Sequence, residues 1–421
     1  MLDLKFIREN SDAVKEAIAR KKDDSDIDEI LALDGRRRET VNRVEQLRAK
    51  RNQVTAEIAR KKKAAEPADE DIAAMKQVGQ DIATLDKTLR ELDDHLRTKL
   101  SRVPNLPHES VPVGADTEGN VEIRHWGEPR EADFEVLPHW EIGSQLGIVH
   151  LPAAARVAGS GFYVLSGMGA RLHRALIAYM LDLHAADGFS EHVVPYIVNA
   201  EAMFGTGQLP KLENDMYRID KDNMYLIPTG EVPLTNLFRD EILNYQQLPL
   251  YLAGHTPCFR REAGAAGKDT RGMLRVHQFD KVELVKIVRP ENSYDELESL
   301  LTQAEKVLRG LMLPYRVVQL CTGDLTFASA KAYDIEIWAM GVKQHLEIST
   351  VSNFEDFQAR RMNCRFRDED GKVRHPHTLN GSGVALARLV AAILENYQNA
   401  DGTVTIPEVL RSYMAGIETI G

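Results

Sequence analysis

Two long stretches near the N-terminus repeat apolar residues at alternating spacings of three and four, and this repeat restricts the fold more than any other feature. The first runs from Ile27 to about Ala65 without a proline, and the second follows Pro67. The seam positions of the first stretch are Leu33, Thr40, Val44, Leu47, Val54 and Ile58, completed by Arg37 and Arg51. Those of the second stretch are Met75, Val78, Ile82, Leu85, Leu89, Leu92 and Leu96. Because such a spacing puts one apolar stripe on each helix, we expect the two to fold back as an antiparallel coiled coil.

The predicted arm is slender and carries positive charge on its distal half. Each helix has roughly 35 residues, which at about 1.5 Å per residue gives a length on the order of 50 Å. Between Arg48 and Lys63 there are seven basic residues and one acid. Such a run is commonly only a solvated helix face. A projecting basic rod can also reach a distant phosphate backbone. The candidate RNA contacts are Arg48, Arg51, Arg60, Lys61, Lys62 and Lys63.

A polar linker follows the arm. The second helical stretch ends at Val103-Pro104, and prolines and glycines continue to Gly119, which is typical of a domain boundary. We therefore predict an N-terminal domain over residues 1–110 and a larger domain over 111–421. With 43% hydrophobic residues the chain can bury a sizeable core, and no apolar run approaches the roughly 20 residues of a membrane helix.

Composition narrows the classes of protein and of binding site that the chain can form. The three cysteines, Cys258, Cys321 and Cys364, are far apart and odd in number, so we expect neither a disulfide framework nor a CxxC zinc site. The net charge of −11 gives no general sign of nucleic-acid binding, so an RNA partner requires a local basic patch. The N-terminal residues lack a signal-peptide core, and we expect a cytoplasmic location.

A charged hairpin is the most informative stretch of the larger domain. Thr256–Glu262 and Arg275–Ile287 read as two strands joined by a Gly/Ala/Lys loop. Since side chains alternate along a strand, one face would carry two arginines, two carboxylates and one aromatic residue. Such a face suits ATP and an amino acid, because arginine matches phosphate, an aromatic ring stacks on a base and a carboxylate pairs with an ammonium. An exposed, salt-bridged hairpin is the alternative.

The hairpin resembles motif 2 of the class II aminoacyl-tRNA synthetases. The resemblance lies in Phe259-Arg-x-Glu262 and Arg275-x-x-x-Phe279-x-x-x-Glu283, and nearly the whole chain is similar to bacterial seryl-tRNA synthetases. It implies an α+β fold: an N-terminal coiled-coil arm that grips tRNA, and a class II domain with a mainly antiparallel sheet flanked by helices. The stretch from Leu172 to Pro195, with Gly188 as a helix cap, is similar to motif 1, which implies a homodimer.

The resemblance also implies the site residues, which fall into three groups. Serine would be bound by Thr229, Glu231, Arg260, Glu283, Asn380 and Ser382. ATP would be bound by Arg260, Glu262, Arg275, Val276, Phe279, Glu347, Ile348, Ser349, Thr350 and Arg388. Catalysis would depend on Arg260, Arg275 and Glu347, with Mg²⁺ on Glu347 and Thr350, since hard oxygen ligands suit this ion. Thr350 and Val351 depart from the Ser-Cys of the family pattern.

The implied activity is the ATP-dependent attachment of L-serine to tRNA(Ser) through a seryl-adenylate. The sequence leaves open whether tRNA(Sec) is a second substrate. The loop Gly264–Gly272, with Lys268, Asp269 and Arg271, would contact the acceptor end of the tRNA. The rival readings are a threonyl-type or carrier-protein-charging relative, and a non-catalytic RNA-binding protein that keeps the fold. The first rival usually has a Cys/His zinc site or lacks the arm, and the second predicts loss of Arg260, Arg275, Glu283 or Arg388.

Overall fold

The computed structural model describes residues 1–263 and 271–421. The chain divides into two compact units. One unit comprises Leu2–Ala19 and Asp23–Pro104, and the other comprises Met1, Arg20–Lys22 and Asn105–Gly421. In the part of the chain with described coordinates, no helix combines the length and apolarity needed to cross a membrane.

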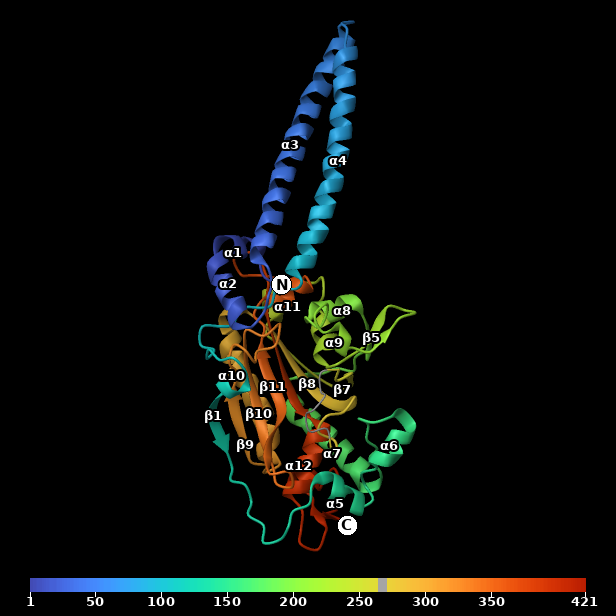
Figure 1. The fold of residues 1–421 in the computed structure, drawn as a ribbon, viewed down its shortest axis with the longest axis vertical. Helices are drawn as coiled ribbons and strands as arrows, with labels where there is room; N and C mark the ends of the chain where they lie inside the picture. Colours follow the sequence, from blue (N-terminus) through green and yellow to red (C-terminus); the bar gives the residue numbers. More distant parts are fainter. Residues whose placement is uncertain (264–270) are drawn as a thin grey trace. The chain divides into compact units, whose positions relative to one another are not determined.

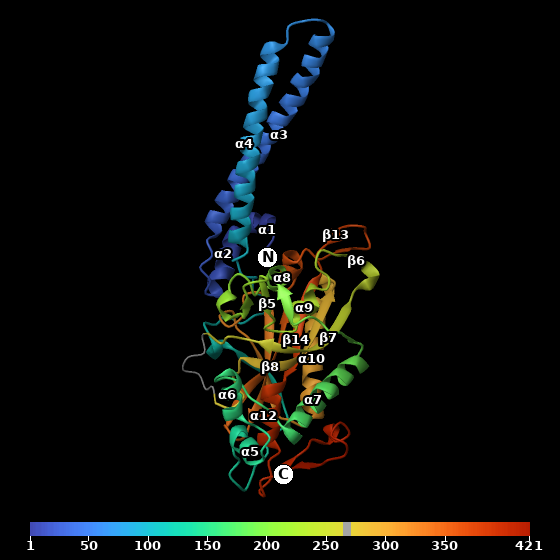
Figure 2. The same ribbon diagram turned by 90° about the vertical axis from the view of Figure 1, so that its right-hand side faces the viewer.

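The first unit is helical, with α1 (Leu4–Glu9) and α2 (Ser11–Arg20) before two long helices. The long helices, α3 (Ile27–Lys63) and α4 (Asp69–Leu100), run side by side (Figures 1 and 2). Asp26 caps α3 by accepting a hydrogen bond from the Glu29 amide, which satisfies one of the free donors at the helix start. Seven predicted seam residues are buried, three on α3 and four on α4, so the coiled coil is confirmed: Leu33, Val44, Leu47, Val78, Ile82, Leu92 and Leu96.

Ion pairs cross the arm beside this seam. Arg37 lies 2.5 Å from Asp93, and Lys61 lies 2.6 Å from Asp71. Such exposed pairs each contribute little stability, about 0–1 kcal/mol. Arg51 is exposed, so its predicted place in the seam was wrong. The long arginine side chain keeps its charged head in water.

The second unit is built on a sheet of eight strands in the order β1-β9-β10-β11-β14-β8-β7-β2. The strands are β1 (Val121–Trp126), β2 (Ser190–Glu191), β7 (Leu250–Phe259), β8 (Gln278–Val288), β9 (Tyr315–Gln319), β10 (Lys331–Ala339), β11 (Gln344–Asn353) and β14 (His377–Ala385). Neighbours pair antiparallel except β2 and β7. The predicted α+β class with a mainly antiparallel sheet is therefore confirmed.

Most helical side chains of the main core come from α7 (Gly167–Ala186), α10 (Ser293–Gly310) and α12 (Leu386–Asn396). Val282 and Leu284 of β8 join this core. The alternate residues Lys281 and Glu283 therefore point to the other face of the strand. This arrangement leaves the second face of β8 free to build a polar site.

Smaller elements surround the sheet. They are the helices α5 (His139–Gln145), α6 (Leu151–Ala158), α8 (Ala200–Gly205), α9 (Glu231–Asn236) and α11 (Phe357–Arg361), and the strands β3 (Ile197–Asn199), β4 (Arg218–Ile219), β5 (Met224–Leu226), β6 (Ile242–Asn244), β12 (Arg365–Arg367), β13 (Val373–Arg374), β15 (Val404–Thr405) and β16 (Thr419–Ile420). The strands form two three-stranded sheets and one two-stranded sheet.

The predicted hairpin is present as β7 and β8, but its strands are shifted from the prediction. Phe259 pairs with Gln278 at the open end, so Arg260, Glu262 and Arg275 lie beyond the strands. The Arg260 amide still bonds the His277 carbonyl at 2.9 Å, and the Arg261 amide then turns to the Asp215 carbonyl. Strand alternation therefore puts Phe279 and Glu283 on one face of β8, but it does not determine the positions of Arg260 and Arg275.

The strand predicted at Glu191–Pro195 is shorter than expected. It is Ser190–Glu191, which runs parallel to β7. The His192 amide still bonds the Ala253 carbonyl at 2.8 Å, after which the chain leaves the sheet edge, and Pro195 has no amide to continue the pairing. Gly188 ends the preceding helix with φ +90°, a conformation that favours glycine.

Candidate active site

A cavity of about 1080 Å³ collects nearly all of the predicted ligand-binding residues. It lies in the second unit, beside the hairpin and the strands β11 and β14. Predicted residues that line it are Thr229, Glu231, Arg260, Glu262, Arg275, Val276, Phe279, Glu347, Ile348, Ser349, Thr350, Asn380, Ser382 and Arg388. Glu283 lies directly behind this lining, because it bonds to Thr229 and Asn380. Five separate segments of the sequence thus meet in one space.

Glu283 is the centre of the end predicted to bind serine. Its carboxylate is fully buried. Thr229 Oγ1 donates to its Oε2 at 2.7 Å, and Asn380 Nδ2 donates to its Oε1 at 3.2 Å. A buried carboxylate needs such donors, because leaving it unpaired would cost several kcal/mol. These contacts fix its orientation toward the cavity.

Lys281 also belongs to this end, and the sequence analysis missed it. Its ammonium forms an ion pair with Glu283 and donates to Thr229 Oγ1 at 2.8 Å. The side chain lines the cavity and is only 5% exposed. The signal was present, since Lys281 alternates with Phe279 and Glu283 on one face of β8.

Glu231 is the second carboxylate of this end. It begins α9 and is almost completely buried. Burial, and next the charge of Glu283, raise its pKa to about 7. Gln358 Nε2 donates to its Oε1 at 2.6 Å and opposes that rise. Gln358 comes from α11, far away in the sequence, so no local pattern could have identified it.

Arg260 and Phe279 lie together toward the predicted nucleotide end. The guanidinium carbon of Arg260 is 5.2 Å from the ring centre of Phe279, and Arg260 Nε donates to the Pro228 carbonyl at 3.2 Å. A cation over an aromatic ring is attracted to it by about 0.5–2 kcal/mol. This contact holds the arginine head at the cavity wall.

Two further arginines line the cavity with acidic partners. Arg275 Nη1 lies 3.0 Å from Glu262 Oε2. Arg388 Nε donates to the Leu274 carbonyl at 3.1 Å, and its Nη1 lies 3.6 Å from Glu347 Oε1. Such charge-assisted bonds order long side chains. An arriving phosphate would have to compete with these carboxylates.

Oxygen side chains suited to Mg²⁺ gather at Thr350. Its hydroxyl donates to Asp334 Oδ1 at 2.6 Å and lies 3.5 Å from Glu347 Oε1. Burial, and next the charge of Glu347, raise the pKa of Asp334, so a cation here would relieve a like-charge contact. The donor set therefore fits a hard cation. Within the described coordinates, no group of three or more His, Cys, Asp or Glu side chains is arranged to hold a metal.

Three predicted nucleotide contacts have side chains that are turned away or engaged. Val276 and Ile348 pack in the main core, and the Ser349 hydroxyl donates to the Ser382 carbonyl at 2.7 Å. Main-chain atoms are therefore what these residues can offer to a nucleotide. Asp334 was not predicted, because it precedes Glu347 on a different strand of the same hairpin.

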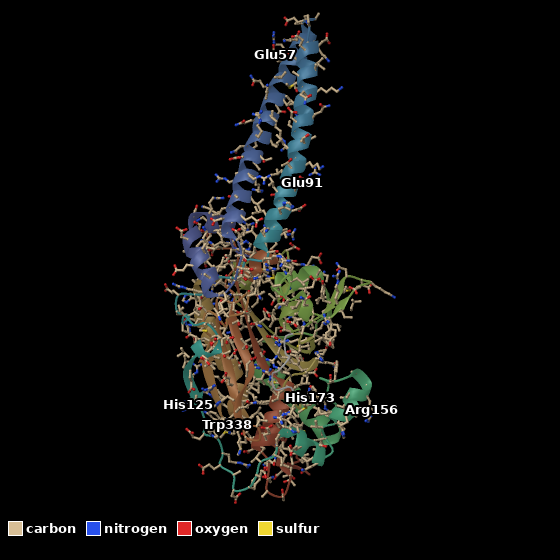
Figure 3. All side chains as sticks on the ribbon, in the orientation of Figure 1. Glu57, Glu91, His125, Arg156, His173 and Trp338 are labelled. Atoms are coloured by element: carbon tan, nitrogen blue, oxygen red, sulfur yellow. The ribbon has the colours of Figure 1, made fainter. Side chains whose placement is uncertain are left out.

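The basic residues of the arm are partly neutralised. Arg48 lies 3.0 Å from Asp86 and Arg60 lies 2.6 Å from Glu57, which Figure 3 labels. Lys61 pairs with Asp71. Arg51, Lys62 and Lys63 form no ion pair with any residue that the structure describes. The acids come largely from α4, which counting charges along α3 alone could not reveal.

The loop predicted to contact the acceptor end of tRNA lies mostly outside the described residues, including Lys268 and Asp269. Its last residues are described. Arg271 lies over Trp140 at 5.2 Å, and the Met273 amide donates to His139 Nε2 at 3.0 Å. His139 Nδ1 in turn contacts Glu395 Oε1 at 2.7 Å. This buried pair fixes the chain just before Arg275.

Comparisons with known proteins agree with this geometry. Residues 1–107 match a family model described as the seryl-tRNA synthetase N-terminal domain, and residues 213–397 match the class II tRNA synthetase core domain (G, H, P, S and T). The chain is 54% identical to the serine–tRNA ligase of Thermodesulfovibrio yellowstonii and 52% identical to that of Desulfitobacterium hafniense strain Y51, with 100% of each chain covered.

Solved structures give the same result. The seryl-tRNA synthetase of Pyrococcus horikoshii, complexed with ATP, superimposes with a TM-score of 0.95 at 40% identity, covering 100% of this chain and 99% of the other. The cytoplasmic serine–tRNA ligase of Naegleria fowleri, in complex with AMP, superimposes with a TM-score of 0.89 at 28% identity, covering 100% of this chain and 98% of the other. From its full-length relatives, its two matched domains and the residues gathered in its cavity, the chain belongs to the seryl-tRNA synthetase family.

Proposed function

We propose that this protein attaches L-serine to tRNA(Ser) with ATP, releasing AMP and diphosphate. The observation that carries the proposal is the single cavity in which buried carboxylates at one end meet arginines and an aromatic ring at the other. Full-length similarity to serine–tRNA ligases supports the choice of amino acid. Because the reaction serves translation, we also propose a cytoplasmic location.

The serine end matches a small zwitterion with a hydroxyl group. Glu231 and Glu283 are the proposed partners of the ammonium, and Thr229 adds a hydroxyl beside them. Asn380 and Ser382 are proposed to contact the substrate on the side of β14. A site with polar groups for the serine hydroxyl would reject alanine, since those groups would be left unpaired.

Activation of serine needs positioning and charge neutralisation more than a strong base, because the serine carboxylate is already ionised at neutral pH. We propose that Arg260 bridges this carboxylate and the α-phosphate, and that Arg275 holds the γ-phosphate. Glu262 would contact the adenine amino group, with Phe279 and Arg388 on the two sides of the base. A bond from the serine carboxylate oxygen to the α-phosphorus would then form as the bond to diphosphate breaks, giving seryl-adenylate.

The proposed Mg²⁺ ligands are Glu347 and Thr350, with Asp334 beside them. When bound, the ion would supply positive charge against the phosphate oxygens of ATP. In the second step a 3′-terminal ribose hydroxyl of tRNA would attack the acyl carbon, and AMP would leave.

The arm is proposed to bind tRNA(Ser) through Arg48, Arg51, Arg60, Lys61, Lys62 and Lys63. We treat residues 1–110 and 111–421 as separate domains for RNA binding and catalysis. Phosphate contacts of this kind position a nucleic acid and make its affinity depend on salt. Whether tRNA(Sec) is also charged is a second question for the same charging assay.

We propose that two copies associate through the region of α7 and β2. Just after β2 the chain exposes apolar side chains: Val193 is 90% exposed and Ile197 is 43% exposed. Residues of this type at a sheet edge favour a covering partner. The resemblance of Leu172–Pro195 to motif 1 makes a second copy of the chain the proposed partner.

The decisive experiment is ATP–diphosphate exchange with a panel of amino acids. We expect exchange that depends on serine, with alanine and glycine inactive. Exchange driven equally by several amino acids would contradict the seryl assignment. Charging of purified tRNA(Ser) and tRNA(Sec) by the same preparation then tests the second step and the choice of tRNA.

A further inference from the structure

A buried lysine shares the serine end of the cavity with both carboxylates. We propose that Lys281 is a positioning residue that pairs with Glu283 and orients it, so that the site with Glu231 ionised carries one net negative charge for the ammonium of serine to neutralise. This inference rests on the proposed function, which it refines by naming what sets the charge of the amino-acid site.

The contacts of Lys281 define this role. Its ammonium touches the Glu283 carboxylate and donates to Thr229 Oγ1 at 2.8 Å. The Thr229 hydroxyl donates onward to the same Glu283 oxygen at 2.7 Å. A hydroxyl has one hydrogen to donate and lone pairs to accept, so the three groups form a closed ring. Rotation of any one of them breaks two contacts.

The charged groups of this ring are buried, so each needs its partner. The Lys281 side chain is 7% exposed and the Glu283 side chain is 0% exposed. At such a position a carboxylate without a cation would be neutralised by a proton. Lys281 therefore supplies the cation that pairs with the buried Glu283 carboxylate behind the cavity wall.

The charge count depends on every ionisable group near the ring. When Glu231 is ionised, it and Glu283 supply two negative charges, and Lys281 supplies one positive charge. Arg260 also acts on Glu231, and the Cys258 thiol lies in the same neighbourhood with its pKa raised by burial. Arg260 is the proposed partner of the serine carboxylate and the α-phosphate. One net negative charge thus remains for the ammonium.

Removing Lys281 should therefore change serine binding in a pH-dependent way. Two buried carboxylates would then share the site without the lysine, with Arg260 engaged by the serine carboxylate and the α-phosphate, and one of the two would hold a proton near neutral pH. Serine would have to displace that proton to form its ion pair. A lysine that only stabilised the fold would produce no such dependence, because its loss would lower stability without changing the titration of the site.

The chain contains a matched control on the same strand. Lys286 is also buried, pairs with Glu296 at 2.7 Å, and points to the opposite face of β8. Lys281→Met and Lys286→Met each remove one buried lysine from an ion pair. Both should lower the melting temperature, but only the first should change the serine site.

The test is the KM for L-serine in ATP–diphosphate exchange, measured from pH 6 to 9 for the full-length protein. For Lys281→Met we expect the KM for serine to rise about tenfold at pH 7, and the midpoint of its pH dependence to move up by about one unit or more. The KM for ATP should stay within about twofold, since the nucleotide groups are unchanged. Lys286→Met should keep the wild-type pH profile.

A double variant keeps the test decisive if Lys281→Met fails to fold. Lys281→Met with Glu283→Gln removes both charges, so it leaves no unpaired buried carboxylate at position 283. If Lys281 acts through Glu283, this double variant and Glu283→Gln alone should have serine KM values within about threefold of each other. A further tenfold loss in the double variant would overturn the inference.

The outcomes separate the two proposals. Wild-type protein without serine-dependent exchange would overturn the proposed function, and this inference with it. Active wild-type protein together with a Lys281→Met variant of unchanged serine KM and pH profile would overturn only the role of Lys281.

Discussion

The hydrogen bond from Gln358 to Glu231 should set the pH range in which serine binds. Gln358 is almost completely buried, and Thr378 Oγ1 donates to its Oε1 at 2.7 Å. That bond turns its amide nitrogen toward Glu231 Oε1, 2.6 Å away. Gln358→Met keeps much of the volume of the side chain and removes this donor. The ionised form of Glu231 should then be less favourable.

The size of the effect follows from the bond. A hydrogen bond to a charged group is worth about 1.5–3 kcal/mol, which corresponds to about one to two pKa units. From a pKa of about 7, the ionised fraction of Glu231 at pH 7 should fall from about one half to between roughly a tenth and a hundredth. The KM for serine should therefore rise about 5- to 50-fold at pH 7 and only up to about fourfold at pH 8.5.

Serine-dependent ATP–diphosphate exchange across this pH range measures the effect. Gln303→Met is the matched control, because Gln303 is also buried but contacts His184 on the far side of the sheet. It should leave the KM for serine unchanged. An increase of the same size at every pH in Gln358→Met would refute the reasoning, since it would indicate a displaced residue and not a changed pKa.

Four other outcomes are expected. Arg260→Ala should lower serine-dependent exchange by about a hundredfold or more, because it removes a positive charge proposed to act in the transition state; the exchange rate at saturating substrates measures this. In the folded protein the pKa of Glu231 is about 7, above its ordinary 4.5, so wild-type stability falls as pH rises through this interval. The free energy of unfolding of Glu231→Gln should therefore exceed that of the wild type by about 1–3 kcal/mol at pH 8. Below about pH 4.5 the variant should show no such excess, and urea denaturation measures both values. Deletion of residues 36–96 should leave exchange largely intact and abolish tRNA charging. Val193→Asp should weaken self-association in sedimentation velocity, since it buries a charge in the proposed contact.

The sequence predicted those features that depend on local repetition. Heptad spacing located α3 and α4 to within a few residues, and alternation placed Phe279 and Glu283 on one face of β8. Alternation failed for Arg260 and Arg275, because both lie beyond the strand ends where the backbone no longer alternates. The resemblance, rather than periodicity, led to those arginines.

The supporting groups of the site were the ones that sequence reasoning missed. Gln358 reaches Glu231 from a helix 127 positions later in the chain, and Asp334 reaches Thr350 across a strand pair. Contacts of this kind arise only when the strands have paired into the sheet, so no spacing along the chain could predict them. Lys281 differs, because a stricter reading of the alternation in β8 would have included it. The roles of all these residues in binding stay predictions.

The position of β14 has a consequence for the synthesis of the protein. This strand is the last of the eight in sequence, yet it lies between β11 and β8. Before residues 377–385 leave the ribosome, the half-sheet that carries Glu347 and the half-sheet that carries Lys281 share no hydrogen-bonded neighbour. The nascent chain therefore cannot complete the cavity until almost the whole polypeptide has been translated, and a truncated product would retain the helical arm without the complete cavity.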